Sequence, residues 1–174
     1  MSYVSRIVGI AILVCSGPAA VAHDSVTEVL RDAQRMADCA KALDAACVIE
    51  LSDAASYELI APAAMHFHFA ESQSRFYAGM RRNGWQYTRF DVYAPSMMFS
   101  GDDLLYAFVP YVDTLEIPER APNEVRAFFI AISHDAGNSW KFVDGEGLTP
   151  ENLQKIIPSY RGQPLPIVRT SDLQ

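Results

Sequence analysis

The segment Ser-His-Asp-Ala-Gly-Asn-Ser-Trp at positions 133–140 constrains the fold of this chain most strongly. It lies between two apolar runs, which predict β-strands over Val125–His134 and Ser139–Asp144. Strands joined by so short a turn must be antiparallel. We expect the carboxylate of Asp135 to accept backbone N–H groups, the turn glycine to take a positive φ, and the ring of Trp140 to pack under the turn.

The same segment fits the pattern S-x-D-x-G-x-x-W of the Asp-box hairpins in sialidase propellers. In a propeller the box recurs in every blade, whereas here it occurs once in a chain of 174 residues. A motif indicates a function only in its structural context. We therefore interpret the box as a structural hairpin.

The first 22 residues are organised like a secretory signal peptide. Arg6 precedes an apolar run over 7–14, and Ala20-Val21-Ala22 places small residues where a signal peptidase cuts. We therefore expect 1–22 to be a signal peptide and 23–174 to be a single exported domain, either periplasmic or secreted.

Two membrane-attached alternatives are weaker. The apolar run is much shorter than the roughly 20 residues of a membrane-spanning helix. Cys15 raises the alternative of a lipoprotein, but Val14 is larger than the small residue that normally precedes a lipidated cysteine. We expect no membrane insertion after cleavage.

The charge of the chain disfavours two classes of partner. The formal net charge is −7, and loss of Arg6 with the signal peptide makes the mature chain more acidic still. An acidic surface repels phosphate backbones and anionic lipid headgroups. We therefore expect no nucleic-acid partner and no binding to a membrane surface.

Two cysteines, Cys39 and Cys47, remain in the mature chain. On one continuous helix they would lie ~12 Å apart at 1.5 Å rise per residue, which is too far for a disulfide. Asp44 is suited to cap a new helix between them, so a helical hairpin could bring the two sulfur atoms together. Two free buried thiols are the alternative, and the sequence leaves both open.

The N-terminal part of the mature chain predicts helices. Ser25 and Glu28 form a capping box, and a first helix runs to about Lys41. Its apolar stripe consists of Val26, Val29, Leu30, Ala33, Met36, Ala37 and Ala40. Further helices are predicted over 44–51, 54–60 and 69–82, the last with Phe76 and Met80 facing inward, and over 149–157.

After Gly84 the apolar period changes from 3.6 to 2. Strands are predicted over Trp85–Tyr93 and Leu104–Leu115, in addition to the two around the Asp box. The fold class is therefore α+β, with N-terminal helices packed on a strongly curved antiparallel sheet of about four to five strands.

Helices followed by a bent sheet resemble the cone fold of the nuclear-transport-factor-2-like superfamily. The chain is most similar to uncharacterised bacterial members of that superfamily. The similar segments are Ala42-Leu43-Asp44, Ala107-Phe108-Val109-Pro110-Tyr111, 131–145, Leu153 and Ile156-Ile157-Pro158. The resemblance implies one cone-fold domain over 23–174 and does not imply a particular activity.

Some proteins of this superfamily are enzymes, including ketosteroid isomerase, scytalone dehydratase and limonene epoxide hydrolase. They use carboxylate, tyrosine or histidine side chains that project into the cone, with pKa values tuned by an apolar pocket. Here Tyr87, Arg89, Asp91 and Tyr93 alternate onto one face of a predicted strand, so Asp91 could act as a base. The alternative that we favour is a solvated outer face with an Arg–Asp pair.

Two functions of different classes follow. The first is a non-catalytic binding or interaction domain, whose cone holds a small apolar ligand or whose sheet meets a partner. Its expected ligand pocket consists of Tyr106, Phe108, Phe128 and Ile130. The alternative is a cone-fold lyase, isomerase or hydrolase acting on a small hydrophobic molecule. That enzyme would use Asp91 or His68 as base and Tyr106 or Tyr57 as hydrogen-bond donor.

The histidines do not indicate a metal site. His66 and His68 could share one side of a strand, but residues two apart do not face together on a helix, and the sequence offers no evident third ligand. His23 would become the mature N-terminus, where copper binding would need a second histidine. We expect no metal, and no cofactor because phosphate-loop and dinucleotide motifs are absent.

The predicted strand over 125–134 is apolar on both faces, with Phe128 and Ile130 on one and Phe129 on the other. One face would pack the helices and the other needs cover. We expect a homodimer that buries Phe129 or its strand neighbours. The alternative is that the Pro-rich tail over 158–166 folds back over the sheet.

The signal-like segment predicts that the exported protein begins at His23 and carries no lipid. Intact-mass measurement of protein recovered from the periplasm of an expression host tests this. A mass that includes a diacylglycerol group on Cys15 would contradict it.

Overall fold

The computed structural model describes residues 19–61 and 68–161. Helices come first in the described chain and strands follow, as the α+β prediction required. The helices are α1 (Ala19–Lys41), α2 (Ala45–Leu51), α3 (Ala54–Ile60), α4 (Phe69–Asn83) and α5 (Pro150–Ile156). The strands are β1 (Gln86–Val92), β2 (Met97–Gly101), β3 (Leu104–Glu116), β4 (Asn123–Ser133) and β5 (Lys141–Asp144).

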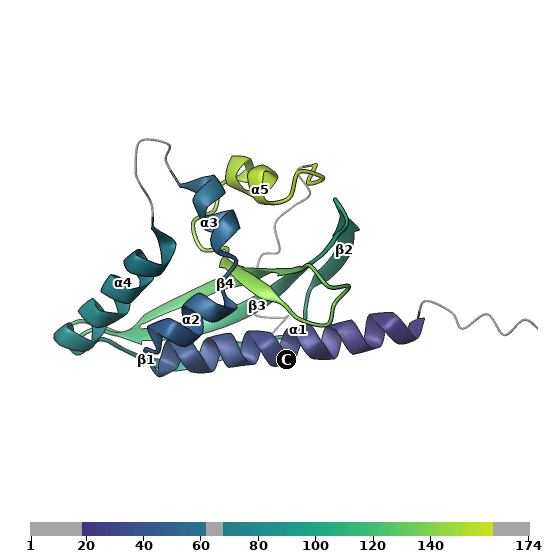
Figure 1. Ribbon diagram of the computed structural model, residues 1–174. Coiled ribbons are helices and arrows are strands. Elements are labelled where there is room, and N and C mark those ends of the chain that lie inside the picture. The colour runs from purple at the N-terminus through teal and green to yellow at the C-terminus, as the bar shows by residue number, and fades with distance from the viewer. Residues whose placement is uncertain (1–18, 62–67, 162–174) are drawn as a thin grey trace, which may run out of the picture.

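The strands form one five-stranded antiparallel sheet in the order β1-β3-β4-β5, and β2 pairs with the first half of β3. α1 lies along one side of this sheet, and α5 lies on the other side (Figure 1). The arrangement is consistent with a cone-like fold. No helix in the described part of the chain combines the length and the apolar character that crossing a membrane requires.

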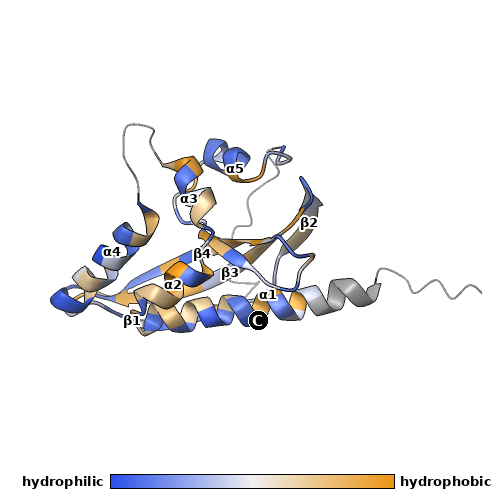
Figure 2. Cartoon of the chain, viewed as in Figure 1, coloured by the Kyte–Doolittle hydropathy of each residue, from blue (hydrophilic) through white to orange (hydrophobic). Residues whose placement is uncertain are grey.

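Both faces of the central strands are buried. On the face toward α1, α2 and α4, the core is built around Val109, Tyr111, Phe129 and Phe142. On the opposite face, α5 closes a second core with the residues Tyr106, Phe108, Phe128, Ile130, Val143, Leu153, Ile156, Ile157 and Tyr160. Figure 2 shows hydrophobic residues gathered on the strands between these helices, whereas α4 is largely hydrophilic.

This double cover corrects the expectation for Phe129. Phe129 is only 5% exposed within a single chain, because α1, α2 and α4 cover its face of the sheet. The other face is covered by α5 and by Tyr160, which belongs to the expected tail over 158–166; the part of this tail beyond residue 161 lies outside the described residues. Phe129 itself is therefore not available for a dimer contact, whereas a homodimer through its strand neighbours or another surface stays a prediction.

The first helix begins earlier than predicted. α1 starts at Ala19, so Ser25 and Glu28 lie inside it and form no capping box at its start. The reason is that the alanine-rich stretch before Ser25 has high helix propensity. Val26 is 37% exposed, in contrast to the predicted stripe, while Val29 and Ala33 are fully buried.

The hairpin between β4 and β5 has the predicted construction. The Asp135 carboxylate accepts the backbone N–H of Ser139 at 2.9 Å and the hydroxyl of Ser133 at 2.8 Å. Gly137 has a φ of 94°, and a side chain there would collide with Ser25 of α1. Trp140 is 1% exposed and donates its ring N–H to the carbonyl of Gly137.

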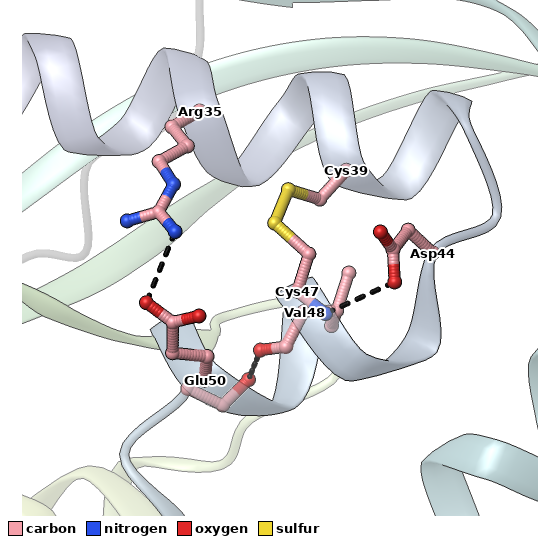
Figure 3. The surroundings of a disulfide bond; sticks show 7 residues. Arg35, Cys39, Asp44, Cys47, Val48 and Glu50 are labelled. Carbon is pink, nitrogen blue, oxygen red and sulfur yellow. Dashed lines mark hydrogen bonds and ion pairs between the residues drawn. A yellow bond between two sulfur atoms is a disulfide. The ribbon is translucent and has the colours of Figure 1, made fainter.

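A disulfide joins α1 to α2. Cys39 and Cys47 are bonded with their Cα atoms 5.8 Å apart, because the chain reverses between them (Figure 3). Asp44 caps α2 by accepting the backbone N–H of Cys47 at 3.1 Å. Arg35 and Glu50 form an ion pair beside the bond at 3.0 Å. The structure therefore contains the disulfide, which was one of the two alternatives that the sequence left open.

Two features of the sheet were missed. β2 was not predicted; its turn into β3 places Asp102 and Asp103 at φ values of 54° and 62°, as a tight hairpin with two left-handed residues requires. The pairing of β1 with β3 also shifts register between Tyr87 and Arg89. This bulge turns Tyr87 to the helix-covered face, where its ring lies 5.6 Å from that of Phe90.

The contacts of the hairpin predict how it responds to substitution. Trp140→Ala should lower the free energy of unfolding by about 3–5 kcal/mol, because it leaves a large cavity in the core. Asp135→Ala should lower it by about 1 kcal/mol, because water can replace part of the lost hydrogen bonding at this exposed turn. Urea denaturation measures both, and wild-type midpoints in both variants would contradict this account.

Candidate functional site

The described chain contains a cavity of about 290 Å³ between the helices and the concave face of the sheet. Residues of α1, α2, α3 and α4, or residues directly at their ends, form its wall together with residues of β1, β3, β4 and β5. The lining residues are Met36, Ala40, Val48, Ser52, Tyr57, Gln73, Phe76, Tyr77, Tyr87, Phe90, Tyr111, Asp113, Phe129, Asp144 and Glu146. The volume lies at the lower end of the usual range for small-molecule sites, roughly 300–1,000 Å³.

Strand pairing explains why these side chains meet. Tyr111 and Asp113 alternate onto the same face of β3, and Asp113 pairs with Phe90 of β1. On the other side of β4, Phe129 pairs with Asp144 of β5. Residues directly opposite in a sheet share a face, so β1, β3, β4 and β5 all contribute to one floor.

A hydrogen-bond network centred on Asp144 connects the floor to α3. The hydroxyl of Tyr111 donates to the Asp144 carboxylate at 2.8 Å, and the backbone N–H of Glu146 donates to the same oxygen at 2.9 Å. The backbone N–H of Asp144 in turn donates to the hydroxyl of Tyr57 at 2.8 Å. Tyr57 is held in place by stacking on Phe69, with ring centroids 4.3 Å apart.

Asp113 is the carboxyl group of the site that neighbouring groups stabilise least. It is 6% exposed, lines the cavity, and has neither a hydrogen bond nor an ion pair within residues 19–61 and 68–161. Burial, together with the nearby carboxylates of Glu146 and Asp144, raises the pKa of Asp113 to about 7. Asp113 therefore changes its charge near neutral pH.

The pKa values of other polar groups of the cavity are raised as well. Burial raises the pKa of Asp144, although hydrogen bonds from Glu146 and Tyr111 oppose this rise. Burial and the charge of Asp144 raise the pKa of Glu146. Burial and the nearby carboxylates raise the pKa of Tyr77 to about 12, so this hydroxyl stays protonated at neutral pH.

The cavity holds three carboxyl groups, and none of its described lining residues is a lysine, arginine or histidine. Within the part of the chain that the structure describes, no three His, Cys, Asp or Glu side chains are grouped so that they could hold a metal ion. The arrangement offers hydrogen-bond donors, acceptors and negative charge to a molecule, in an otherwise aromatic enclosure.

Of the residues that the sequence analysis singled out, Tyr57 lies in this cavity. The expected pocket of Tyr106, Phe108, Phe128 and Ile130 is corrected: these residues point to the opposite face of the sheet. There they form a second buried core with α5, although Tyr106 also borders an open hollow beside β2. The error has a simple origin, since both faces of β3 and β4 are apolar and only the packed helices distinguish them.

The predicted bases also lie elsewhere. Asp91 is on the outer face of the sheet, paired with Arg89, which also contacts Glu124 at 3.6 Å. This is the solvated Arg–Asp pair that the sequence analysis favoured. His68 is exposed at the start of α4 and makes no side-chain cap, while His66 lies outside the described residues. Phe76, expected to face inward, is 48% exposed at the rim of the cavity.

Sequence reasoning missed Asp113 and Asp144, although a signal for both exists. Each interrupts or ends an apolar strand, in Tyr-Val-Asp at 111–113 and Phe-Val-Asp at 142–144. A carboxylate at an inward position of a buried strand is unusual unless it has a partner or a function. In both segments a carboxylate also lies two residues after a buried aromatic residue, on the same face of the strand.

No family model, curated protein or solved structure matches this chain. Membership of the nuclear-transport-factor-2-like superfamily therefore stays a prediction that rests on the motifs in the sequence and on the cone-like arrangement.

The raised pKa of Asp113 predicts a pH-dependent stability. The pKa of Asp113 is 3.8 in the unfolded state and about 7 in the folded state. Between pH 3.8 and pH 7 the folded protein therefore holds a proton that the unfolded chain has lost, and the free energy of unfolding falls as the pH rises through this range. Asp113→Asn should therefore stabilise the protein at pH 8 by about 2–4 kcal/mol and have little effect near pH 4.

Urea denaturation of wild type and variant at both pH values measures this difference. Asp91→Asn is the matched control, because Asp91 is about half exposed and lies on the outer face; its effect should be within about 0.5 kcal/mol at either pH. An equal effect of Asp113→Asn at pH 4 and pH 8 would show that Asp113 is not buried as described.

Proposed function

We propose that this chain is a small-molecule-binding domain and that the concave cavity is its binding site. The observation that carries the proposal is Asp113, a residue that is only 6% exposed, lines the cavity, and makes no hydrogen bond or ion pair with another described residue. A buried polar group without a partner destabilises the fold. A ligand that reaches into the cavity would supply the missing partner.

The composition of the cavity refines the expectation of an apolar ligand. The floor combines the rings of Phe90 and Phe129 with the polar groups of Tyr111, Asp113 and Asp144. Such a mixture fits a molecule with an apolar body and at least one hydrogen-bonding group. We therefore propose an amphipathic small molecule rather than a purely apolar one.

The proposal includes a cone-fold domain that acts outside the cytoplasm. The signal-like segment over 1–22 supports export, and most of it lies outside the described residues. The disulfide between Cys39 and Cys47 supports an oxidising compartment, since such bonds are rare in the cytosol.

Blocking the mouth of the cavity tests the site. Gln73 lines the cavity from α4, so Gln73→Trp should fill the entrance. Arg75→Trp is the matched control on the same helix, because the Arg75 side chain is 76% exposed. In saturation-transfer NMR with a library of aromatic fragments, binders of the wild type should bind Arg75→Trp but not Gln73→Trp. Fragments that bind all three proteins equally would contradict a site in this cavity.

An enzyme that moves a proton is the second candidate function, and Asp113 is the observation that favours it. A pKa of about 7 suits a general base at neutral pH, and the protonated hydroxyls of Tyr57 and Tyr77 could bind a developing oxyanion. In this function Asp113 takes the role first expected of Asp91 or His68.

The two functions differ in the fate of the bound molecule. A ligand recovered from the protein by native mass spectrometry should be unchanged after incubation with fresh wild-type protein if the domain only binds. Conversion by the wild type, and its loss in Asp113→Asn, would instead support the enzyme.

A further inference from the structure

We propose that the ligand of the concave cavity is an organic cation, meaning an amine or quaternary ammonium compound with a small apolar body. This inference rests on the proposed function, because it names the class of molecule that the same site would take.

The wall of the cavity carries acidic groups without a balancing cation. Asp113, Asp144 and Glu146 contribute three carboxyl groups, and the described lining residues contribute no cationic side chain that could neutralise them. The outer face of the sheet is different, since Asp91 and Glu124 are both paired with arginines there. The acidic groups of the cavity thus have no counter-charge among the residues that line it.

Asp113 combines low exposure of the whole residue with a carboxyl group that no described residue engages. Asp113 is 6% exposed, lines the cavity and makes no hydrogen bond or ion pair in the described parts of the chain. Asp144, by contrast, accepts bonds from Tyr111 and from the backbone of Glu146. A positively charged donor beside Asp113 would supply the one interaction that the wall lacks.

An aromatic floor lies beside this carboxyl. The ring centroids of Phe90 and Tyr111 lie 5.0 Å apart, and those of Tyr111 and Phe129 lie 4.5 Å apart, so three aromatic rings that line the cavity are packed together. Tyr87 extends this group of rings from the bulge in β1. Aromatic faces attract cations through the ring quadrupole, and they bind ammonium groups in this way.

The shape of the site favours an organic cation over a metal ion. The described residues include no group of three metal-ligating side chains, whereas the cavity measures about 290 Å³. An ammonium group with an attached ring or chain would fill such a space, with its charge near the carboxyls and its apolar body against the rings. An anion would meet like charge and is disfavoured.

The inference predicts a definite pH dependence. Loss of the Asp113 proton, at a pKa of about 7, creates the negative charge that the cation needs. Affinity should therefore increase as the pH rises from 5 to 8, for as long as the amine remains protonated. Asp113→Asn should remove most of this pH dependence.

The test compares three probes of similar shape: benzylammonium, benzyl alcohol and benzoate. Isothermal titration calorimetry at pH 8 should give a dissociation constant for benzylammonium about tenfold lower than that for benzyl alcohol, and benzoate should bind more weakly than either. Asp113→Asn should weaken benzylammonium binding about tenfold and leave benzyl alcohol binding within about twofold.

Two further variants test whether the effect on binding is specific to the carboxyl groups of the cavity. Glu146→Gln changes an exposed residue at the rim, so it should fold normally and weaken benzylammonium binding about threefold. Asp91→Asn, on the outer face, should leave the affinity for all three probes unchanged. Calcium chloride is titrated as a compact cation and should not compete with benzylammonium.

The outcomes separate the two proposals. Equal or tighter binding of benzyl alcohol, or displacement of benzylammonium by calcium, would overturn the organic cation while leaving a small-molecule site in the cavity. Binding of benzylammonium that Asp113→Asn and Glu146→Gln do not change would also overturn it. Failure of all three probes and of the aromatic fragments to bind the wild type would remove both this inference and the proposed function.

Discussion

The burial of β3 and β4 on both faces is the constraint on which the rest of this structure depends. Their pairing extends from Leu105 opposite Ser133 to Leu115 opposite Asn123, and large apolar side chains project from both sides. A sheet of this kind needs a layer on each face. α1, α2 and α4 supply one layer, and α5 supplies the other together with Tyr57 and Ile60 of α3, so both faces of the central strands are covered within one chain (Figure 1).

The candidate site arises where one of these layers is incomplete. α1 and α2 cover the sheet around Phe129, but toward α4 a space remains above Tyr111 and Asp113. Hydrogen bonds hold Tyr57, Tyr111 and Asp144 around this space, and so the cavity has a defined polar wall. The stability lost by burying carboxyl groups there is the kind of strain that proteins retain at functional sites.

Local features of the fold were predictable because neighbouring residues decide them. The turn at Asp135 is determined by residues within one short segment, and the cap at Asp44 by its place between the end of one helix and the start of the next. Errors arose where the pattern was ambiguous. β2 is short, the bulge before Arg89 reverses the facing of Tyr87, and the capping box at Ser25 was overridden by a helix that begins at Ala19.

The sequence left the pairing of Cys39 with Cys47 open, but by itself it determined the fold class, the hairpin around Trp140 and the antiparallel strands. These depend on periodicity, turn residues and caps, which act over a few residues. Only the tertiary structure decided which apolar face of the sheet holds the acidic cavity and which packs against α5. That choice depends on how distant helices pack, and strands that are apolar on both faces carry no local signal of it. For this reason Asp113 and Asp144 became visible as one site only after β3, β4 and β5 had been placed side by side in one sheet.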